Sequence, residues 1–338
     1  MLKAAIVGFG GIAKSHRMGY AHLEEEGKVE LVAACDINPE AFTKKITLNI
    51  DTGSEDLKEH INFYTNIEEM LKKEELDFID VCLPTFIHKE MTVKLLERGY
   101  NVLCEKPMSL TYSECTEMIE AAKNSGKELM IAQCLRFSNA HNYAKTAIED
   151  GRFGRVLGAY FARLSAPPRW SWENWFMNPE RSGGCLTDLH VHDVDMIRYL
   201  FGEPTAVSCH ATTSICKHDT VHSSFFYGDT PVTAIGDWTL TGMPFKSEFR
   251  IDFENATLDC KGYTITIYPK DGGESYQPEY ENTSAYESEI SFFCDVLDGK
   301  CENTVSPATS AAMTIKLVEA LRTSADANGK VVKFNTEN

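Results

Sequence analysis

Two patterns along the sequence predict an α/β domain followed by an α+β domain. Over residues 1–135, short apolar runs alternate with amphipathic stretches, as in a parallel sheet that helices cover on both faces. Over residues 136–338, runs of alternating apolar and polar residues separated by glycine turns predict a large, mostly antiparallel sheet. A chain of 338 residues is long enough for two domains with full cores.

Residues 2–36 form one complete nucleotide-binding pattern of strand, glycine turn, helix, strand and acidic residue. The apolar run 2–7 is followed by a G-x-G-x-x-A form of the Rossmann dinucleotide fingerprint: Gly8, Phe9, Gly10, Gly11, Ile12 and Ala13. Gly8 makes the tight turn, Gly10 lets the backbone approach a pyrophosphate, and Ala13 allows close helix packing. The pyrophosphate is expected at the N-terminus of the helix 12–25, whose N–H groups and dipole favour negative charge.

A second apolar run, residues 29–35, ends at Asp36. This acidic residue follows the glycine turn by about twenty residues, the spacing at which a dinucleotide-binding domain holds the ribose. Its carboxylate would repel a 2′-phosphate, and Ile37 and Asn38 offer no arginine to hold one. The sequence therefore predicts NAD rather than NADP. The alternative is a tight turn that binds nothing.

The rest of the first domain continues the alternation. Strands are expected near 61–64, 78–83, 101–104 and 129–134, and helices near 39–49, 67–75, 88–98 and 111–124. In open parallel sheets, ligands bind outside the carboxyl ends of the strands. The residues after two of these strands are therefore expected to meet the cofactor: Pro84, Thr85, His88, Glu105 and Lys106.

The second domain begins with an expected helix at 139–150 and a strand at 156–164, followed by a loop rich in proline and tryptophan. Further strands are expected at 206–215, 221–227, 232–240, 249–253, 263–268 and 331–334, and helices at 188–201, 285–297 and 307–327. Trp172 and Trp175, in the loop, could face a sugar ring, and core packing of the loop is the alternative for Trp172.

The predicted helix 188–201 carries a candidate catalytic pair. Asp188 and His192 are four residues apart and so would lie on one face, with Asp195 one turn further on. An ordinary surface pair is the alternative. His190, His192 and Asp193 form a His-x-His-Asp string that also suggests a metal site, but His190 and His192 are two apart and would point about 200° from each other on a helix. We therefore predict no metal and a structural role for His190.

These motifs resemble the glucose-fructose oxidoreductase, inositol dehydrogenase and rhizopine-catabolism (Gfo/Idh/MocA) family over essentially the whole chain. The resemblance rests on the glycine turn, Pro84-Thr85-x-x-His88, Glu105-Lys106-Pro107, Arg136-Phe137, and Gly183-Gly184 followed by Asp188 and His192. The chain departs from common family residues at Thr85, Ser182 and His190, where many members have Asn, Gly and Gly.

The resemblance implies roles for several residues. Lys106, Asp188 and His192 would form the catalytic group, and Lys106 would also reach the nicotinamide ribose. Glu105 would lie beside the nicotinamide, and Trp175 near the substrate. Arg136 would either face the cofactor or pair with an acidic neighbour. The open face of the second sheet would pack against another subunit, which predicts a homodimer or homotetramer.

Composition excludes several classes of partner. The chain has 33 Lys and Arg against 50 Asp and Glu, a net charge of −17, which argues against nucleic acid and anionic membranes. Its eleven cysteines form no C-x-x-C pair, which indicates reduced, buried thiols. The start of the sequence leads directly into the first strand and no run approaches membrane-spanning length, so we expect a cytoplasmic protein.

The predicted function is an NAD-dependent dehydrogenase that acts on a secondary alcohol of a sugar, inositol or related polyol. His192 would be the general base, Lys106 would stabilise the alkoxide, and Asp188 would orient His192 or bind a neighbouring hydroxyl. One alternative is a redox-neutral enzyme in which bound NAD transiently oxidises a sugar. The other is a non-catalytic regulator that binds NAD or a sugar.

Overall fold

The computed structural model of the protein describes residues 1–43, 61–281 and 283–336. Contacts within the chain define two compact units. The first unit comprises residues 1–134, 170–175 and 284–312, and the second comprises residues 135–169, 176–283 and 313–338. The sequence analysis assigned all residues after 135 to one domain, whereas two later segments join the first unit.

The first unit contains a six-stranded sheet in which every pairing is parallel. Its strands are β1 (Leu2–Val7), β2 (Val29–Cys35), β3 (Asn62–Tyr64), β4 (Phe78–Val81), β5 (Asn101–Glu105) and β6 (Leu129–Ala132), in the order β3-β2-β1-β4-β5-β6. The middle strands are buried on both faces, as expected for a parallel sheet under helices. The predicted Rossmann-like fold is confirmed.

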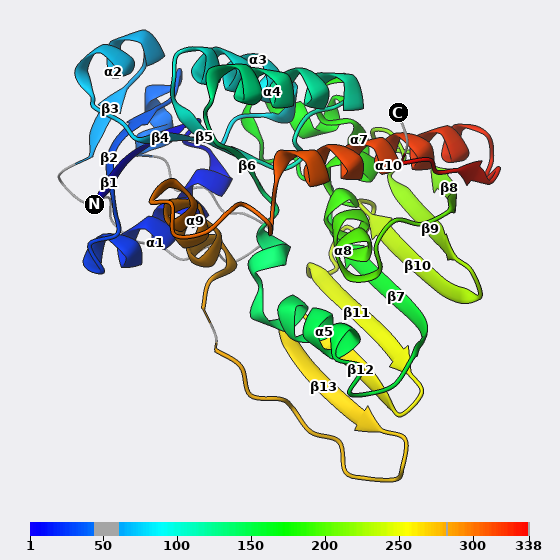
Figure 1. Ribbon diagram of the computed structural model, residues 1–338. Helices are drawn as coiled ribbons and strands as arrows, with labels where there is room; N and C mark the ends of the chain where they lie inside the picture. Colours follow the sequence, from blue (N-terminus) through cyan, green and yellow to red (C-terminus); the bar gives the residue numbers. More distant parts are fainter. Residues whose placement is uncertain (44–60, 282, 337–338) are drawn as a thin grey trace. The chain divides into compact units, whose positions relative to one another are not determined.

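Helices cover both faces of this sheet. They are α1 (Gly11–Glu25), α2 (Ile67–Lys73), α3 (Thr85–Glu97), α4 (Tyr112–Ser125) and α9 (Ala285–Leu297), with a 3₁₀ turn η1 (Pro39–Phe42). Figure 1 shows α3 and α4 on one side of the sheet and α1 and α9 on the other. The predicted helix 39–49 begins as η1, and its part beyond residue 43 lies outside the described residues.

Helix α9 comes from far along the chain and packs closely on α1. A Cβ atom placed on Gly19 would lie 3.0 Å from the backbone N of Glu287. The rings of Phe78 and Phe293 meet edge to face at 5.3 Å, and Lys28 Nζ lies 2.7 Å from an Asp295 carboxylate oxygen. The first unit is thus completed by a segment that sequence patterns placed in the second domain.

The second unit is built on an eight-stranded sheet. Its strands are β7 (Val156–Leu164), β8 (Ala206–Thr212), β9 (Thr220–Tyr227), β10 (Thr230–Asp237), β11 (Lys246–Phe253), β12 (Ala256–Lys261), β13 (Thr264–Pro269) and β14 (Val332–Lys333), in the order β13-β12-β11-β7-β10-β9-β8-β14. Among the described strands of this second sheet, only the β7–β10 pairing is parallel. The predicted large, mostly antiparallel sheet is confirmed, and β12 is a strand that the sequence analysis missed.

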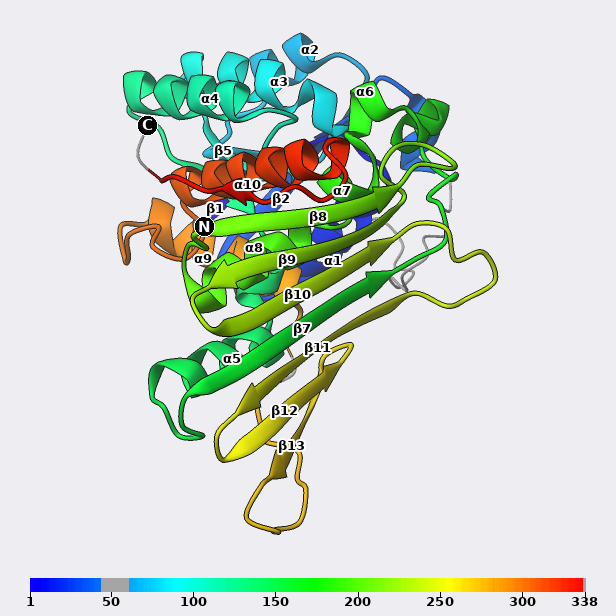
Figure 2. The same ribbon diagram turned by 90° about the vertical axis from the view of Figure 1, so that its right-hand side faces the viewer.

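Helices pack on one face of this second sheet. The remaining helical segments are α5 (Asn139–Glu149), α6 (Pro179–Ser182), α7 (Gly184–Asp188), α8 (Val191–Phe201), α10 (Ala308–Asp326), η2 (Cys134–Phe137) and η3 (Trp172–Met177). Figure 2 shows α5 and α8 behind the sheet and the opposite face turned toward the viewer. No described helix is long and apolar enough to cross a membrane. All eleven cysteines are free and nine are buried, as predicted.

Candidate active site

The glycine turn joins β1 to α1 in a conformation that few residues tolerate. Gly8 has φ 89°, and a Cβ atom there would lie 2.6 Å from the carbonyl oxygen of Cys82. Helix α1 begins at Gly11, directly after its N-cap residue Gly10. It has no side-chain cap and no acidic residue in its first turn. A Cβ atom on Gly10 would have no neighbour within 4 Å, so this backbone faces open space. The turn therefore fits a pyrophosphate that approaches the helix N-terminus.

Asp36 lies beside this turn. One carboxylate oxygen accepts a hydrogen bond from Phe9 N at 2.7 Å, and the other accepts one from Asn38 N at 2.8 Å. Each oxygen has a further lone pair, so the carboxylate can still accept ribose hydroxyls. The Phe9 ring is buried against Phe42, with a centroid distance of 5.6 Å. Phe9 thus fixes the turn through its backbone and its packing, and the residues present fit an NAD ribose.

The turns after β4 and β5 are tied together by His88. Its Nδ1 lies 2.8 Å from the Pro107 carbonyl oxygen and its Nε2 lies 2.7 Å from the Leu83 carbonyl oxygen. Burial lowers the pKa of His88. Both ring nitrogens lie against backbone carbonyls and 1% of the residue is exposed, and a contact between this ring and a cofactor stays a prediction. Pro84 and Thr85 form the start of α3 beside it.

Glu105 and Lys106 end β5, at the carboxyl edge of the sheet. Glu105 is buried and directed inward, because one carboxylate oxygen lies 2.9 Å from His16 Nε2 and the other accepts a hydrogen bond from Lys106 N at 2.9 Å. Lys106 is only half-buried and precedes a cis peptide bond to Pro107. The charged group nearest to solvent at this strand end is therefore Lys106.

The predicted helix 188–201 is divided in two. Helix α7 ends at Asp188 and α8 starts at Val191, and the N–H of His190 bonds to the Cys185 carbonyl five residues earlier. This wide turn interrupts the chain between Asp188 and His192, so the prediction of one continuous helix is wrong, and a shared face for the two side chains stays a prediction. Asp188 is 7% exposed at the end of α7, and His192 is half-buried in the first turn of α8.

Gly184, the first residue of α7, has a backbone conformation and a close neighbour that require glycine. It has φ 74°, and a Cβ atom there would lie 2.2 Å from the carbonyl oxygen of Lys217. In the described structure, the close neighbour of Gly184 is the backbone of the same unit.

His190 and Asp193 have structural partners. His190 is fully buried with Nε2 3.0 Å from Ser223 Oγ, and burial with nearby Arg163 lowers its pKa to about 3. Asp193 is buried and pairs with Arg163, whose Nε and Nη2 each lie 3.1 Å from a carboxylate oxygen. These contacts support the structural interpretation of His190.

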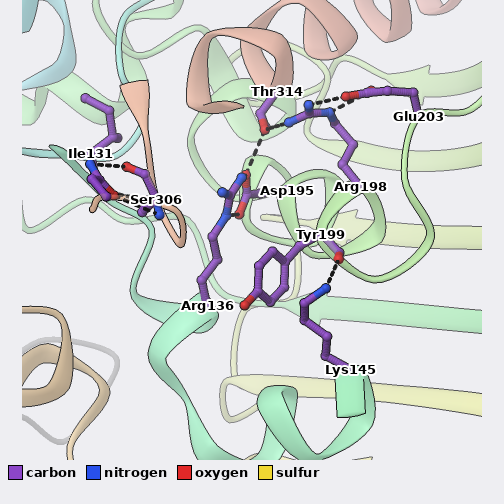
Figure 3. Close-up of polar contacts among 10 residues, drawn as sticks. Ile131, Arg136, Lys145, Asp195, Arg198, Tyr199, Glu203, Ser306 and Thr314 are labelled. Atoms are coloured by element: carbon purple, nitrogen blue, oxygen red, sulfur yellow. Dashed lines mark hydrogen bonds and ion pairs between the residues drawn. The ribbon is translucent and has the colours of Figure 1, made fainter. Parts of the chain in front are cut away.

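Arg136 pairs with Asp195, the second of the two alternatives for this residue (Figure 3). Its Nε and Nη2 lie 2.8 and 2.6 Å from the two Asp195 carboxylate oxygens, and both side chains are 2% exposed. Thr314 donates to the same carboxylate at 2.7 Å, and Arg198 donates to Thr314 at 2.6 Å. Arg136 thus anchors α8 and α10 within the second unit, and its predicted role as a cofactor residue is not supported.

The tryptophan loop belongs to the first unit by its contacts. Trp172 is 44% exposed, so core packing is excluded for this side chain. Trp175 is half-buried at the end of the same loop segment. A substrate contact by Trp175 stays a prediction.

Within the first unit, the sheet edge thus brings together the glycine turn, Asp36, the start of α3 and Lys106. Asp188 and His192 belong to the second unit, so their convergence with Lys106 also stays a prediction. The sequence analysis missed a buried group of polar residues around His16 in the first unit. Its one visible signal was Asp80, a carboxylate inside the otherwise apolar run 78–83.

The sequence matches two protein-family models. Residues 2–133 match the oxidoreductase family model with an NAD-binding Rossmann fold, GFO_IDH_MocA, and residues 141–264 match the GFO/IDH/MocA C-terminal domain. The chain is similar to a 2,7-anhydro-N-acetylneuraminate hydratase of Mediterraneibacter gnavus, 32% identical over 198 residues, or 59% of this chain and 49% of that protein. A 1,5-anhydro-D-fructose reductase of Ensifer adhaerens is 33% identical over 144 residues, or 42% and 43% of the two chains.

The chain therefore spans about half the length of these curated relatives. A solved structure of the WlbA dehydrogenase from Bordetella pertussis, in complex with NADH and UDP-GlcNAcA, has the same fold with a TM-score of 0.79, at 20% identity and over 99% of both chains. The two family models cover most of the sequence in order, and the Rossmann-like sheet agrees with the first of them. The protein belongs to the Gfo/Idh/MocA family of oxidoreductases and has an NAD-binding Rossmann domain.

Proposed function

We propose that this protein is an NAD-dependent dehydrogenase of a secondary alcohol in a sugar, inositol or related polyol. The observation that supports it most is the position of a half-buried lysine, Lys106, at the sheet edge that also carries the glycine turn and Asp36. The names of the similar proteins, an anhydro-sugar reductase and a dehydrogenase bound to a sugar nucleotide, support a carbohydrate substrate.

Each polar residue then has a distinct task. Bound NAD supplies the acceptor for the hydride. Lys106 stabilises the negative charge on the substrate oxygen, His192 accepts the hydroxyl proton, and Asp188 orients His192 or binds a neighbouring hydroxyl. An imidazole suits the proton step because its ordinary pKa lies near 6.5. Trp175 presents a flat apolar face to the sugar ring.

A redox-neutral reaction is the second candidate. It is supported by the similarity to a hydratase, since such a name denotes a reaction without net oxidation. A non-catalytic regulator is less well supported, because a sensor has no need of the set formed by Lys106, Asp188 and His192.

One experiment separates these functions. The purified protein is incubated with NAD and a panel of inositols, aldoses, amino sugars and anhydro sugars, while NADH absorbance and product formation are both followed. NADH formed in proportion to product supports the dehydrogenase. Product without net NADH supports the redox-neutral enzyme, and binding without product supports the regulator.

Asp36→Asn should weaken NAD binding by about tenfold or more, because charge-assisted hydrogen bonds to the ribose are lost. It should also narrow the preference for NAD over NADP, since the repulsion of a 2′-phosphate disappears. Asn keeps an acceptor for the Phe9 N–H, so the turn is preserved. Titration of both cofactors by calorimetry tests this, with the exposed neighbour Ile37→Ala as control. Tighter binding of NADP than of NAD by the unmodified protein would refute the assignment.

We further propose that the open sheet face of the second unit joins copies of this chain in a homodimer or homotetramer. Strand register places Tyr160, Thr233 and Ser224 side by side on one face, and Phe226 on the same face is 39% exposed. Light scattering should return a multiple of 37.9 kDa, and Thr233→Arg should shift the protein toward the monomer. A monomeric mass at micromolar concentration would exclude this assembly.

A further inference from the structure

Three carboxylates surround one histidine inside the first unit. His16 comes from α1, Asp80 from β4, Glu105 from the end of β5 and Glu289 from α9, and we call these four residues the His16 cluster. Each is at most 4% exposed. Buried charges without a matching partner are costly, so the protonation of this cluster is strongly constrained.

His16 bonds to two carboxylates at once. Its Nδ1 lies 2.7 Å from an Asp80 oxygen and its Nε2 lies 2.9 Å from a Glu105 oxygen. Ionised carboxylates only accept hydrogen bonds, so with Asp80 and Glu105 ionised both ring nitrogens carry a proton and His16 is an imidazolium. Tyr20 donates to Asp80 at 3.1 Å, and Lys106 N donates to Glu105 at 2.9 Å. Asp80 and Glu105 are therefore the well-supported anions.

Glu289 lacks such support. It is fully buried, and neither of its carboxylate oxygens has a hydrogen-bond partner in the described structure. Its nearest cation is His16, with Nε2 at 3.8 Å, and that N–H already bonds to Glu105. One imidazolium cannot balance three anions in this interior.

We propose that Glu289 is a neutral carboxylic acid in the folded protein, a positioning residue that leaves the His16 Nε2–H to Glu105 and so holds Glu105 and the Lys106 backbone in place. An ionised Glu289 would compete with Glu105 for that N–H. The Glu105 side chain, at the end of β5 beside Lys106, would then lose its hydrogen bond to His16 and keep the one from Lys106 N.

The surroundings agree with this assignment. Among the described residues, the titratable groups that face the cluster from the packed elements are Tyr20 from α1, Cys82 from β4, His88 from α3, Cys104 from β5, and Tyr286 and Cys294 from α9. Phenols and thiols form no cation, and burial lowers the pKa of His88. Burial raises the pKa of Glu289 well above its ordinary value, and Glu105 and Asp80 raise it further while His16 opposes them.

A metal ion is the competing explanation, since two triads that share His16 present ligand atoms within 4.8 Å of one another: His16, Glu105 and Glu289, and His16, Asp80 and Cys82. Structural zinc almost always takes four ligands, and each triad offers three. The 2.9 Å separation of His16 Nε2 from Glu105 is also a hydrogen-bond distance.

Glu289→Gln tests the proton on Glu289, because the amide is neutral at every pH. A group whose pKa is raised by folding contributes stability below its unfolded pKa, near 4.5 for Glu, and that stability is lost as pH rises through the folded pKa. Wild type should therefore melt near the temperature of Glu289→Gln at pH 4.5. Above pH 4.5, the melting temperature of wild type should fall relative to that of the variant by roughly 2–4 °C per pH unit, as long as Glu289 keeps its proton in the folded protein.

Glu287→Gln is the matched control. Glu287 lies on the same helix and pairs with the exposed His22 instead of the cluster. Because His22 is largely exposed, the loss of this pair should change the melting temperature little at any pH, in contrast to the growing difference expected for Glu289→Gln. His16 also has a raised pKa, which makes stability fall above pH 6.5 in wild type and in both variants, so its contribution cancels in the comparison while Glu289 is neutral.

Parallel melting curves for wild type and Glu289→Gln, or a variant that becomes less stable as pH rises, would overturn the proposal. So would a stoichiometric metal in purified wild type that disappears in Glu289→Gln. If Glu289→Gln fails to fold, Glu289→Met decides: a folded Met variant supports a neutral group, and failure of both indicates a required anion.

The positioning role has a separate test, and only this arm rests on the proposed function. The kcat of wild type should fall at alkaline pH as Glu289 ionises, and Glu289→Gln should keep its kcat there. An unchanged pH profile would remove the positioning role. If no substrate reduces NAD, the proposed function fails while the melting comparison still decides the protonation.

Discussion

Replacing Lys106 by Ala is expected to lower kcat by about a hundredfold or more, while NAD affinity changes by less than about threefold. The lysine stabilises charge that develops on the substrate oxygen, so its contribution appears mainly in the transition state. Its place at the end of β5 is independent of its side chain, because the backbone N of Lys106 bonds to Glu105. The truncated variant should therefore keep its fold.

Steady-state formation of NADH and a separate NAD titration measure the two effects. Lys89→Ala is the control, since Lys89 lies on α3 of the same unit and pairs with Glu117. His192→Ala should resemble Lys106→Ala. The double variant should be little slower than either single variant, because residues that act as a unit are not additive.

Single variants that keep most of the kcat would refute the roles of Lys106 and His192. An experimental structure with NAD that places His192 far from the nicotinamide C4, with no domain closure to bring it near, would do the same. Either result would favour the regulator.

Asp195→Ala is expected to destabilise the second unit by roughly 3–5 kcal/mol, because it leaves the Arg136 guanidinium buried without its carboxylate partner. The pair is bidentate at 2.8 and 2.6 Å, and the same carboxylate accepts the Thr314 hydroxyl (Figure 3). Removing the Asp195 carboxylate therefore takes away the acceptor shared by the Arg136 guanidinium and the Thr314 hydroxyl.

Chemical denaturation followed by circular dichroism measures this loss. Arg136→Met combined with Asp195→Leu should recover much of the stability, since well-packed apolar residues can replace a buried ion pair. Asp150→Ala, which removes the exposed pair with Arg152, should shift the denaturation midpoint far less than Asp195→Ala does. A mild effect of Asp195→Ala would mean that water or another group solvates Arg136 in solution.

Much of the first unit could be predicted from local sequence. The glycine turn, the alternation of strands with helices and the spacing from Gly8 to Asp36 depend on residues close together in the chain. Such patterns reflect helix and strand periodicity and the φ angles that only glycine adopts freely. Local patterns did not show which distant groups the His88 ring and the Arg136 side chain contact.

The sequence by itself determined the family, the two kinds of sheet and the position of Lys106 at a strand end. Only the tertiary structure decided where each charge finds its partner: Arg136 with Asp195, His190 with Ser223, and His16 among carboxylates. The tertiary structure also places α9 in the first unit and shows two helices where the sequence predicted one over 188–201. The physical reason is that backbone conformation is governed largely by neighbouring residues. The free energy of a buried charge instead depends on groups that lie far away in the sequence and meet only after folding.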